Sequence, residues 1–235
     1  MTKEIPTGTE GIPPSDTIED ADESLKSGKF LQAFDSATKL HDFAERFSKP
    51  NLQARSAHVV ALSLQRIRRP VAGESSIDWF KKSDDLYGNL ESSQDTVFSQ
   101  VGVKRDLAMA LVKRRQEGDF SEAQSILDTG ITLLEGLPNP SLPEIELEKY
   151  YTEHHKRRTS LVQRSPSSSA LNRSWEDAVA IRKLHDSAYG RFNPGHTDYE
   201  LDARMFANRY EWRIGVMARN LGRNGLLAVS RGHLK

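Results

Sequence analysis

The sequence predicts an all-α protein built as a solenoid of antiparallel helix pairs, and two observations lead to this fold class. From Asp16 onward, apolar residues recur at intervals of three and four, and no stretch keeps the period of two that is typical of a strand. A helix-corner motif also returns roughly every 45 residues, and self-similarity at such a period indicates stacked helical repeats.

The corner motif is an aromatic residue at a helix–helix turn, followed three residues later by alanine. The alanine lets two helices approach closely, while the ring fills the corner between them. In two copies a glycine, Gly28 or Gly118, stands two residues before the aromatic residue, and residues 75–88 look like a further copy without this glycine. The three clear copies are Phe30 with Ala33, Phe120 with Ala123 and Trp175 with Ala178.

The elements follow in order along the chain. Residues 1–15 hold prolines and glycines with almost nothing apolar, so we expect a disordered leader before a solenoid that spans 16–235. The serine-rich segment 164–174 is expected to be a mobile loop. First helices are expected near 16–27, 50–69, 93–117, 142–164 and 198–222. Second helices are expected near 30–47, 76–90, 120–136 and 174–190, with a short last helix after 224.

Capping signals and apolar stripes refine these helices. Asp119 with Glu122 has the spacing of a side-chain acceptor at a helix start and an acid three residues on. The expected core stripe of the helix near 30–47 is Leu31, Phe34, Ala37, Leu40 or His41, Ala44 and Phe47. That of the helix near 120–136 is Ile126, Thr129 or Gly130, Leu133 and Leu137.

Composition restricts the compartment. Hydrophobic residues make up 37% of the chain and charged residues 28%, which is ordinary for a soluble folded protein. The chain has no cysteine, which excludes disulfides and fits a reducing compartment. Its start lacks the features of a signal peptide, and its longest apolar stretch, 58–64, is too short to span a bilayer. We therefore expect a cytoplasmic protein that does not enter a membrane.

No catalytic motif is present in the sequence. It contains neither GxGxxG nor GxxxxGK[ST], the glycine-rich loops that bind phosphate groups, and no HExxH. His154 and His155 are adjacent, so on a helix they point about 100° apart and cannot share a metal. We expect a protein that is not an enzyme and that needs no cofactor and no metal.

The two ends of the chain carry opposite charge. Residues 1–149 contain 18 Lys and Arg against 25 Asp and Glu, whereas residues 150–235 contain 15 against 8. The basic end could attract an acidic partner. In the alternative interpretation, its charged side chains only lie on solvated helix faces. Its arginines alternate with aromatic residues, which suggests RNA binding as the alternative function. The helical spacing of these aromatics favours core positions, and hence a protein or peptide partner over nucleic acid.

The stretch EGDFSEAQSILDTGITLLEGLPNP, residues 117–140, resembles the end of the first helix and the second helix of a tetratricopeptide repeat. The segments around Trp175, 189–204 and 218–223 are similar to the longer repeat of kinesin light chains, whose glycine-proline-histidine-acid turn matches His196 and Asp198, although Thr197 stands where proline is usual. The resemblance implies a right-handed superhelix whose first helices line a concave groove, and the function of a scaffold or adaptor for protein partners.

The helix expected near 198–222 supplies the predicted binding site. Its core stripe would run through Phe206, Tyr210 and Ile214, which leaves other side chains on a neighbouring stripe. An amide can hold a peptide backbone, arginine can bind a carboxylate, and tryptophan adds a large apolar contact. In the alternative interpretation, the tryptophan is buried in the core and the arginine side chains are exposed to solvent. The predicted partner-binding residues are Arg204, Asn208, Arg209, Trp212 and Arg213.

The last segment, residues 224–235, predicts self-association. A solenoid needs a polar helix to cover its final apolar face, but this segment is short and keeps apolar side chains. We therefore expect a homo-oligomer, docking on a partner, or the continuation of a longer repeat array. The residues expected at this contact are Leu226, Leu227 and Val229.

Overall fold

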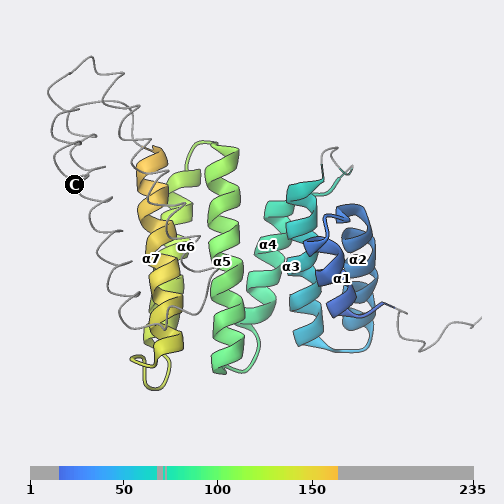
Figure 1. Cartoon of the computed structure of the whole chain (residues 1–235), viewed down its shortest axis with the longest axis horizontal. Helices are drawn as coiled ribbons and strands as arrows, with labels where there is room; N and C mark the ends of the chain where they lie inside the picture. The colour runs from blue at the N-terminus through green and yellow to red at the C-terminus, as the bar shows by residue number, and fades with distance from the viewer. Residues whose placement is uncertain (1–15, 68–70, 72, 164–235) are drawn as a thin grey trace, which may run out of the picture. The chain divides into compact units, whose positions relative to one another are not determined.

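The computed structural model describes residues 16–67, 71 and 73–163, and all the regular structure in these residues is α-helical (Figure 1). Each described helix begins and ends within three residues of the range expected from the sequence. The all-α prediction is therefore confirmed for this part of the chain, whereas the leader 1–15 and the loop 164–174 lie outside it. The helices are α1 (Ile18–Lys26), α2 (Phe30–Arg46), α3 (Pro50–Arg66), α4 (Ser76–Gly88), α5 (Gln94–Arg114), α6 (Asp119–Glu135) and α7 (Pro143–Gln163).

Two of the predicted corners are formed by glycines with a left-handed backbone. Gly28, between α1 and α2, has φ +80°, and Gly118, between α5 and α6, has φ +84°. This conformation is favourable for glycine and strained for other residues. Ala33 and Ala123, the alanines that follow these corners, are completely buried. The turn and the buried alanine of the motif are thus confirmed at both sites, whereas Phe30 and Phe120 are half-buried. Helices α2, α4 and α6 start at residues 30, 76 and 119, close to the expected period.

The pair α3 and α4 achieves its close contact differently. The small residues lie on α3, where Ala54, Ala57 and Ala61 have no exposed surface. From α4, the Ser83 hydroxyl donates a hydrogen bond of 2.8 Å to the backbone carbonyl of Ala54. Phe80 can therefore be large and still be completely buried. This explains why the copy at 75–88 needs no alanine after its aromatic residue.

The predicted core stripes need correction in α2 and α6. Leu31 is 62% exposed and Phe47 is 40% exposed, at the two ends of the α2 stripe. Apolar spacing identifies a helix face, but it does not tell how far along the helix a neighbour extends. Of the stripe predicted for α6, Gly130 and Leu137 are buried, but the rest of the buried stripe runs one residue further round than predicted, through Leu127 and Leu134 in place of Ile126 and Leu133. Within the helix, the buried stripe consists of Ala123, Leu127, Gly130 and Leu134.

The predicted helix cap at Asp119 is wrong. Gly118 is the N-cap of α6, and Asp119 is the first residue of the helix, with 1% of its surface exposed. Its carboxylate faces back toward the end of α5, where it accepts a hydrogen bond of 2.7 Å from the backbone N–H of Gln116. It also accepts bonds from Nη2 and Nε of Arg114, at 2.6 and 3.1 Å. Asp119 therefore fixes the turn between the two helices.

The contacts divide the chain into two compact units, Met1–Asp106 and Leu107–Lys235, with the boundary inside α5. In the first unit α1 packs against α2 and α3, and α3 packs against α2 and α4. In the second unit α6 packs against α7, and Gln124 Nε2 donates to the Ser160 hydroxyl at 2.6 Å. A hydrophobic core of the first unit joins α1, α2 and α3 through Ile18, Ala21, Ala37, Leu40, Val59 and Val60.

Candidate functional site

All the site residues predicted from the sequence lie outside the described residues, so they stay predictions. This applies to both groups: Arg204, Asn208, Arg209, Trp212 and Arg213 for partner binding, and Leu226, Leu227 and Val229 for self-association. The described residues contain a different candidate, on α1, α3 and α5 of the N-terminal unit, which the sequence predicts to be first helices. We call it the first-helix face, and it consists of Glu19, Asp22, Arg55, His58 and Asp106.

Arg55 and His58 of this face lie on a partly exposed stripe along α3, which we call the α3 stripe. Pro50 starts the helix at a position where a missing N–H costs nothing. Alanine, valine and serine residues of α3 are buried against its neighbours. The residues left on the opposite stripe are spaced at intervals of four and three, which places them on one side of the helix. They are Asn51, Arg55, His58, Leu62 and Gln65.

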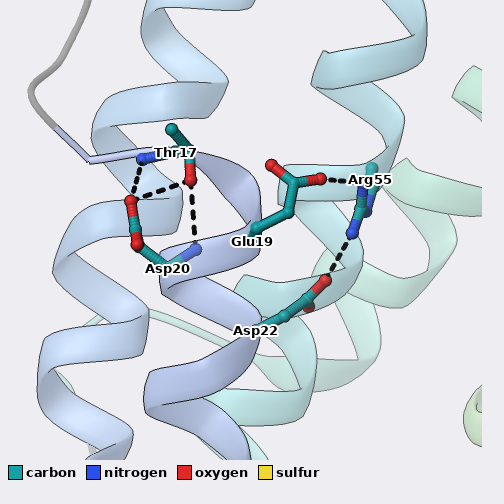
Figure 2. A network of polar contacts seen from close by, with 5 residues as sticks. All are labelled: Thr17, Glu19, Asp20, Asp22 and Arg55. Carbon is teal, nitrogen blue, oxygen red and sulfur yellow. Dashed lines mark hydrogen bonds and ion pairs between the residues drawn. The ribbon is translucent and has the colours of Figure 1, made fainter.

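Arg55 joins α3 to α1 (Figure 2). Its Nη1 lies 2.8 Å from Oε1 of Glu19, and its Nη2 lies 2.6 Å from Oδ2 of Asp22. Burial of the guanidinium lowers the pKa of Arg55, but the hydrogen bonds to Asp22 and Glu19 outweigh this effect and raise it. The pKa of Glu19 is lowered, first by a hydrogen bond from its own backbone N–H and then by Arg55. The ion pairs with Arg55 thus fix the side chains of Glu19 and Asp22 against α3.

A capping box fixes the start of α1, and with it the position of Glu19 and Asp22. The Thr17 hydroxyl accepts a hydrogen bond of 3.2 Å from the backbone N–H of Asp20, and the Asp20 carboxylate accepts one of 2.8 Å from the backbone N–H of Thr17 (Figure 2). The pKa of Asp20 is lowered by this backbone hydrogen bond and then by the Thr17 side chain. The sequence signal for this cap, threonine followed three residues later by an acid, is present but was missed.

His58 joins α3 to α5, one helical turn after Arg55. Its Nε2 lies 2.9 Å from Oδ2 of Asp106, and its ring packs against Phe80 of α4 with a centroid distance of 5.8 Å. The imidazole is about one fifth exposed and the carboxylate about two fifths. Residues three apart on a helix lie on the same side. Two positions of α3 that lie one helical turn apart therefore contact different helices, α1 through Arg55 and α5 through His58.

A buried layer supports the face from α4. Asp84 accepts hydrogen bonds of 2.7 Å from Lys104 Nζ and 3.0 Å from Gln100 Nε2, both on α5. Burial raises the pKa of Tyr87, although a hydrogen bond with the Ser99 side chain opposes this effect. These contacts fix α5 against α4, so Asp106 is held in place by more than its bond to His58.

The arrangement has the chemistry of a binding surface. Its guanidinium, imidazole and carboxylate groups come from three helices and remain partly exposed, so they can form hydrogen bonds with a second molecule. Within the described residues, no three histidine, aspartate or glutamate side chains come close enough to bind a metal ion. None of the described helices is both long and apolar enough to span a membrane.

Comparison with known proteins gives no match: no family model fits the chain, and no curated protein matches it. The sequence reasoning also missed every residue of the first-helix face as a site. Arg55 lies 36 residues from Glu19 and 33 from Asp22, and His58 lies 48 residues from Asp106. No local pattern connects residues so far apart in the chain.

Proposed function

We propose that this chain is a non-catalytic scaffold for protein–protein interactions, built as a tetratricopeptide-like solenoid whose first helices form the binding surface. One observation carries the proposal: a single stripe of α3 contacts α1 through Arg55 and α5 through His58. In a solenoid, each repeat contacts its neighbours, so the first helices of successive pairs lie side by side. That is the contact pattern of α1, α3 and α5 in the N-terminal unit.

Contacts of the second helices support the same arrangement. The rings of His41 on α2 and Trp79 on α4 lie edge to face with a centroid distance of 5.0 Å. Asp84 on α4 pairs with Lys104 on α5 at 2.7 Å. Helices thus contact the next helix in the chain and the one after it. A solenoid of helix pairs has this nearest-neighbour order.

The proposed partner is a protein or peptide. An extended peptide needs donors and acceptors along its length, and the α3 stripe offers amide, guanidinium and imidazole groups at successive turns. We propose that Arg204, Asn208, Arg209, Trp212 and Arg213 also bind the partner and give the protein an affinity for acidic segments. The proposal includes a cytoplasmic location and self-association through Leu226, Leu227 and Val229.

The test combines partner capture with two matched substitutions. Gln65→Arg adds a long cation to the α3 stripe, whereas Gln32→Arg makes the same change on the exposed side of α2, a second helix. Full-length wild type and both variants are used to capture partners from native lysate, with and without nuclease. The affinity of each captured partner is then measured with purified protein at two salt concentrations.

We expect Gln65→Arg to weaken binding by about fivefold or more, since disturbing an important contact of an interface costs above roughly 1 kcal/mol. Gln32→Arg should leave the affinity within about twofold. Equal effects of the two substitutions would contradict the assignment of the surface to the first helices. Partners that are lost with nuclease and show a steep salt dependence would support the alternative, an RNA-binding helical-repeat protein.

A further inference from the structure

His41, on α2, is a buried histidine whose hydrogen bonding is incomplete. Only 1% of its surface is exposed. Its Nδ1 lies 3.1 Å from the backbone carbonyl oxygen of Gln53 on α3. Since a carbonyl only accepts hydrogen bonds, Nδ1 must carry a proton and Nε2 is the unprotonated nitrogen of the neutral ring. Nε2 is also buried and has no hydrogen-bond partner.

The same ring connects three helices of the N-terminal unit. Besides its bond to α3, it packs edge to face against Trp79 of α4, with ring planes at 84°. Trp79 is itself held from two sides, by a hydrogen bond from its indole nitrogen to Glu74 and by Lys82, whose Nζ lies 4.8 Å from the ring centroid. The contact between α2 and α4 therefore depends on a titratable group.

The surroundings of His41 disfavour its charged form. Burial is the main cause that lowers its pKa, and the positive charge of Lys82 on α4 lowers it further. The Gln53 carbonyl from α3 and the acids Glu45 and Asp42 on its own helix act in the opposite direction, but they do not outweigh burial. The native arrangement therefore prefers neutral His41, whereas an open arrangement would expose it to water and restore its ordinary pKa of 6.5.

We propose that the junction of α2, α3 and α4 at His41 is an acid-sensitive joint. Protonation of Nε2 adds a donor and a positive charge at a buried position that has no acceptor. The chain relieves this by moving the C-terminal half of α2 away from Gln53 and Trp79, so that the imidazolium reaches water. Acidification below neutral pH thus opens the N-terminal unit at one defined place, independently of what the protein binds.

The size of the effect follows from linkage. A group with a lowered pKa in the closed state favours that state at high pH, and the preference is lost as pH falls below the pKa of the open state. With an open-state pKa near 6.5, the opening constant should rise by up to about tenfold between pH 7.5 and 5.5. The rise is smaller if the closed state also binds protons within this range.

Hydrogen exchange of the full chain at pH 7.5 and 5.5, corrected for the intrinsic pH dependence of exchange, tests the proposal. We expect amides of α2 and the facing turns of α3 and α4 to exchange several-fold to tenfold faster at pH 5.5, while α6 and α7 serve as the internal reference. His41→Phe keeps a ring but cannot titrate, so this acceleration should disappear. His58→Gln, which removes the neighbouring histidine of the first-helix face, should retain it.

An acceleration that persists in His41→Phe, or that is absent from the wild type, would overturn the proposal. If His41→Phe does not fold, the wild type still decides the question through the NMR titration of its histidine side chains. The signal of His41 should then titrate with a midpoint below 6.5, together with the exchange of α2. A midpoint at or above 6.5 would show that protonation does not oppose the closed joint.

Discussion

Replacing Asp119 by Ala should destabilise the turn between α5 and α6 far more than a surface change of the same charge. The carboxylate is 1% exposed and accepts three hydrogen bonds, one from the Gln116 N–H and two from Arg114. The substitution leaves the backbone N–H of Gln116 without this acceptor. It also leaves the Arg114 cation without this carboxylate.

The magnitude follows from these contacts. Hydrogen bonds to a charged group contribute about 1.5–3 kcal/mol, and removing one partner of a fully buried ion pair costs about 3–5 kcal/mol. Arg114 is 36% exposed, so water can solvate its charge in the variant and the loss is reduced. We therefore expect Asp119→Ala to lower the free energy of unfolding by about 2–3 kcal/mol. Asp119→Asn, which keeps an acceptor, should lower it by about 1–2 kcal/mol.

Urea unfolding followed by circular dichroism at 222 nm is the assay, with Asp128→Asn as the matched control. Asp128 is on the same helix and pairs with Lys156 at 2.5 Å, but it is 54% exposed. A surface ion pair contributes about 0–1 kcal/mol, so the control should be nearly as stable as the wild type. If Asp119→Ala and Asp128→Asn lose the same stability, the structural role assigned to the buried carboxylate is wrong.

Three further outcomes follow from the packing and the ion pairs. In the same urea assay, Phe80→Ala should lower the free energy of unfolding by about 3–5 kcal/mol because the ring is completely buried. Leu31→Ala, at an exposed site, should change it by less than about 0.5 kcal/mol. Similar losses in the two variants would contradict the core assignment. Gly118→Ala should lower the free energy of unfolding by about 1–2 kcal/mol because φ at this position is +84°. An added Cβ would meet no atom within 4 Å, so this cost comes from the backbone alone. A variant as stable as the wild type would contradict this geometry. Arg55→Met should accelerate hydrogen exchange in α1 while leaving α6 unchanged, and unaltered α1 rates would show that the ion pairs do not hold the helix.

The sequence alone determined the helices. The boundaries of all seven described helices agree with the expected ranges to within three residues, because helix periodicity, proline and glycine act through neighbours in the chain. Gly28 and Gly118 could be assigned to turns for the same local reason, and both have positive φ. Ala33 and Ala123 could be assigned to close helix–helix contacts because a small side chain next to a helix turn lets two helices approach each other.

Only the tertiary structure decided which faces meet. In α6 both Ile126 and its neighbour Leu127 are apolar, so the spacing fits two adjacent stripes, and the one containing Leu127 is buried. Asp119 has the pattern of a helix cap, but Arg114 and the Gln116 N–H draw its carboxylate into the turn instead. The first-helix face could not be predicted because Arg55 and His58 find their partners more than thirty residues away along the chain. A sequence pattern records the preferences of a segment, whereas an ion pair between helices exists only after packing has brought their charged side chains within 3 Å.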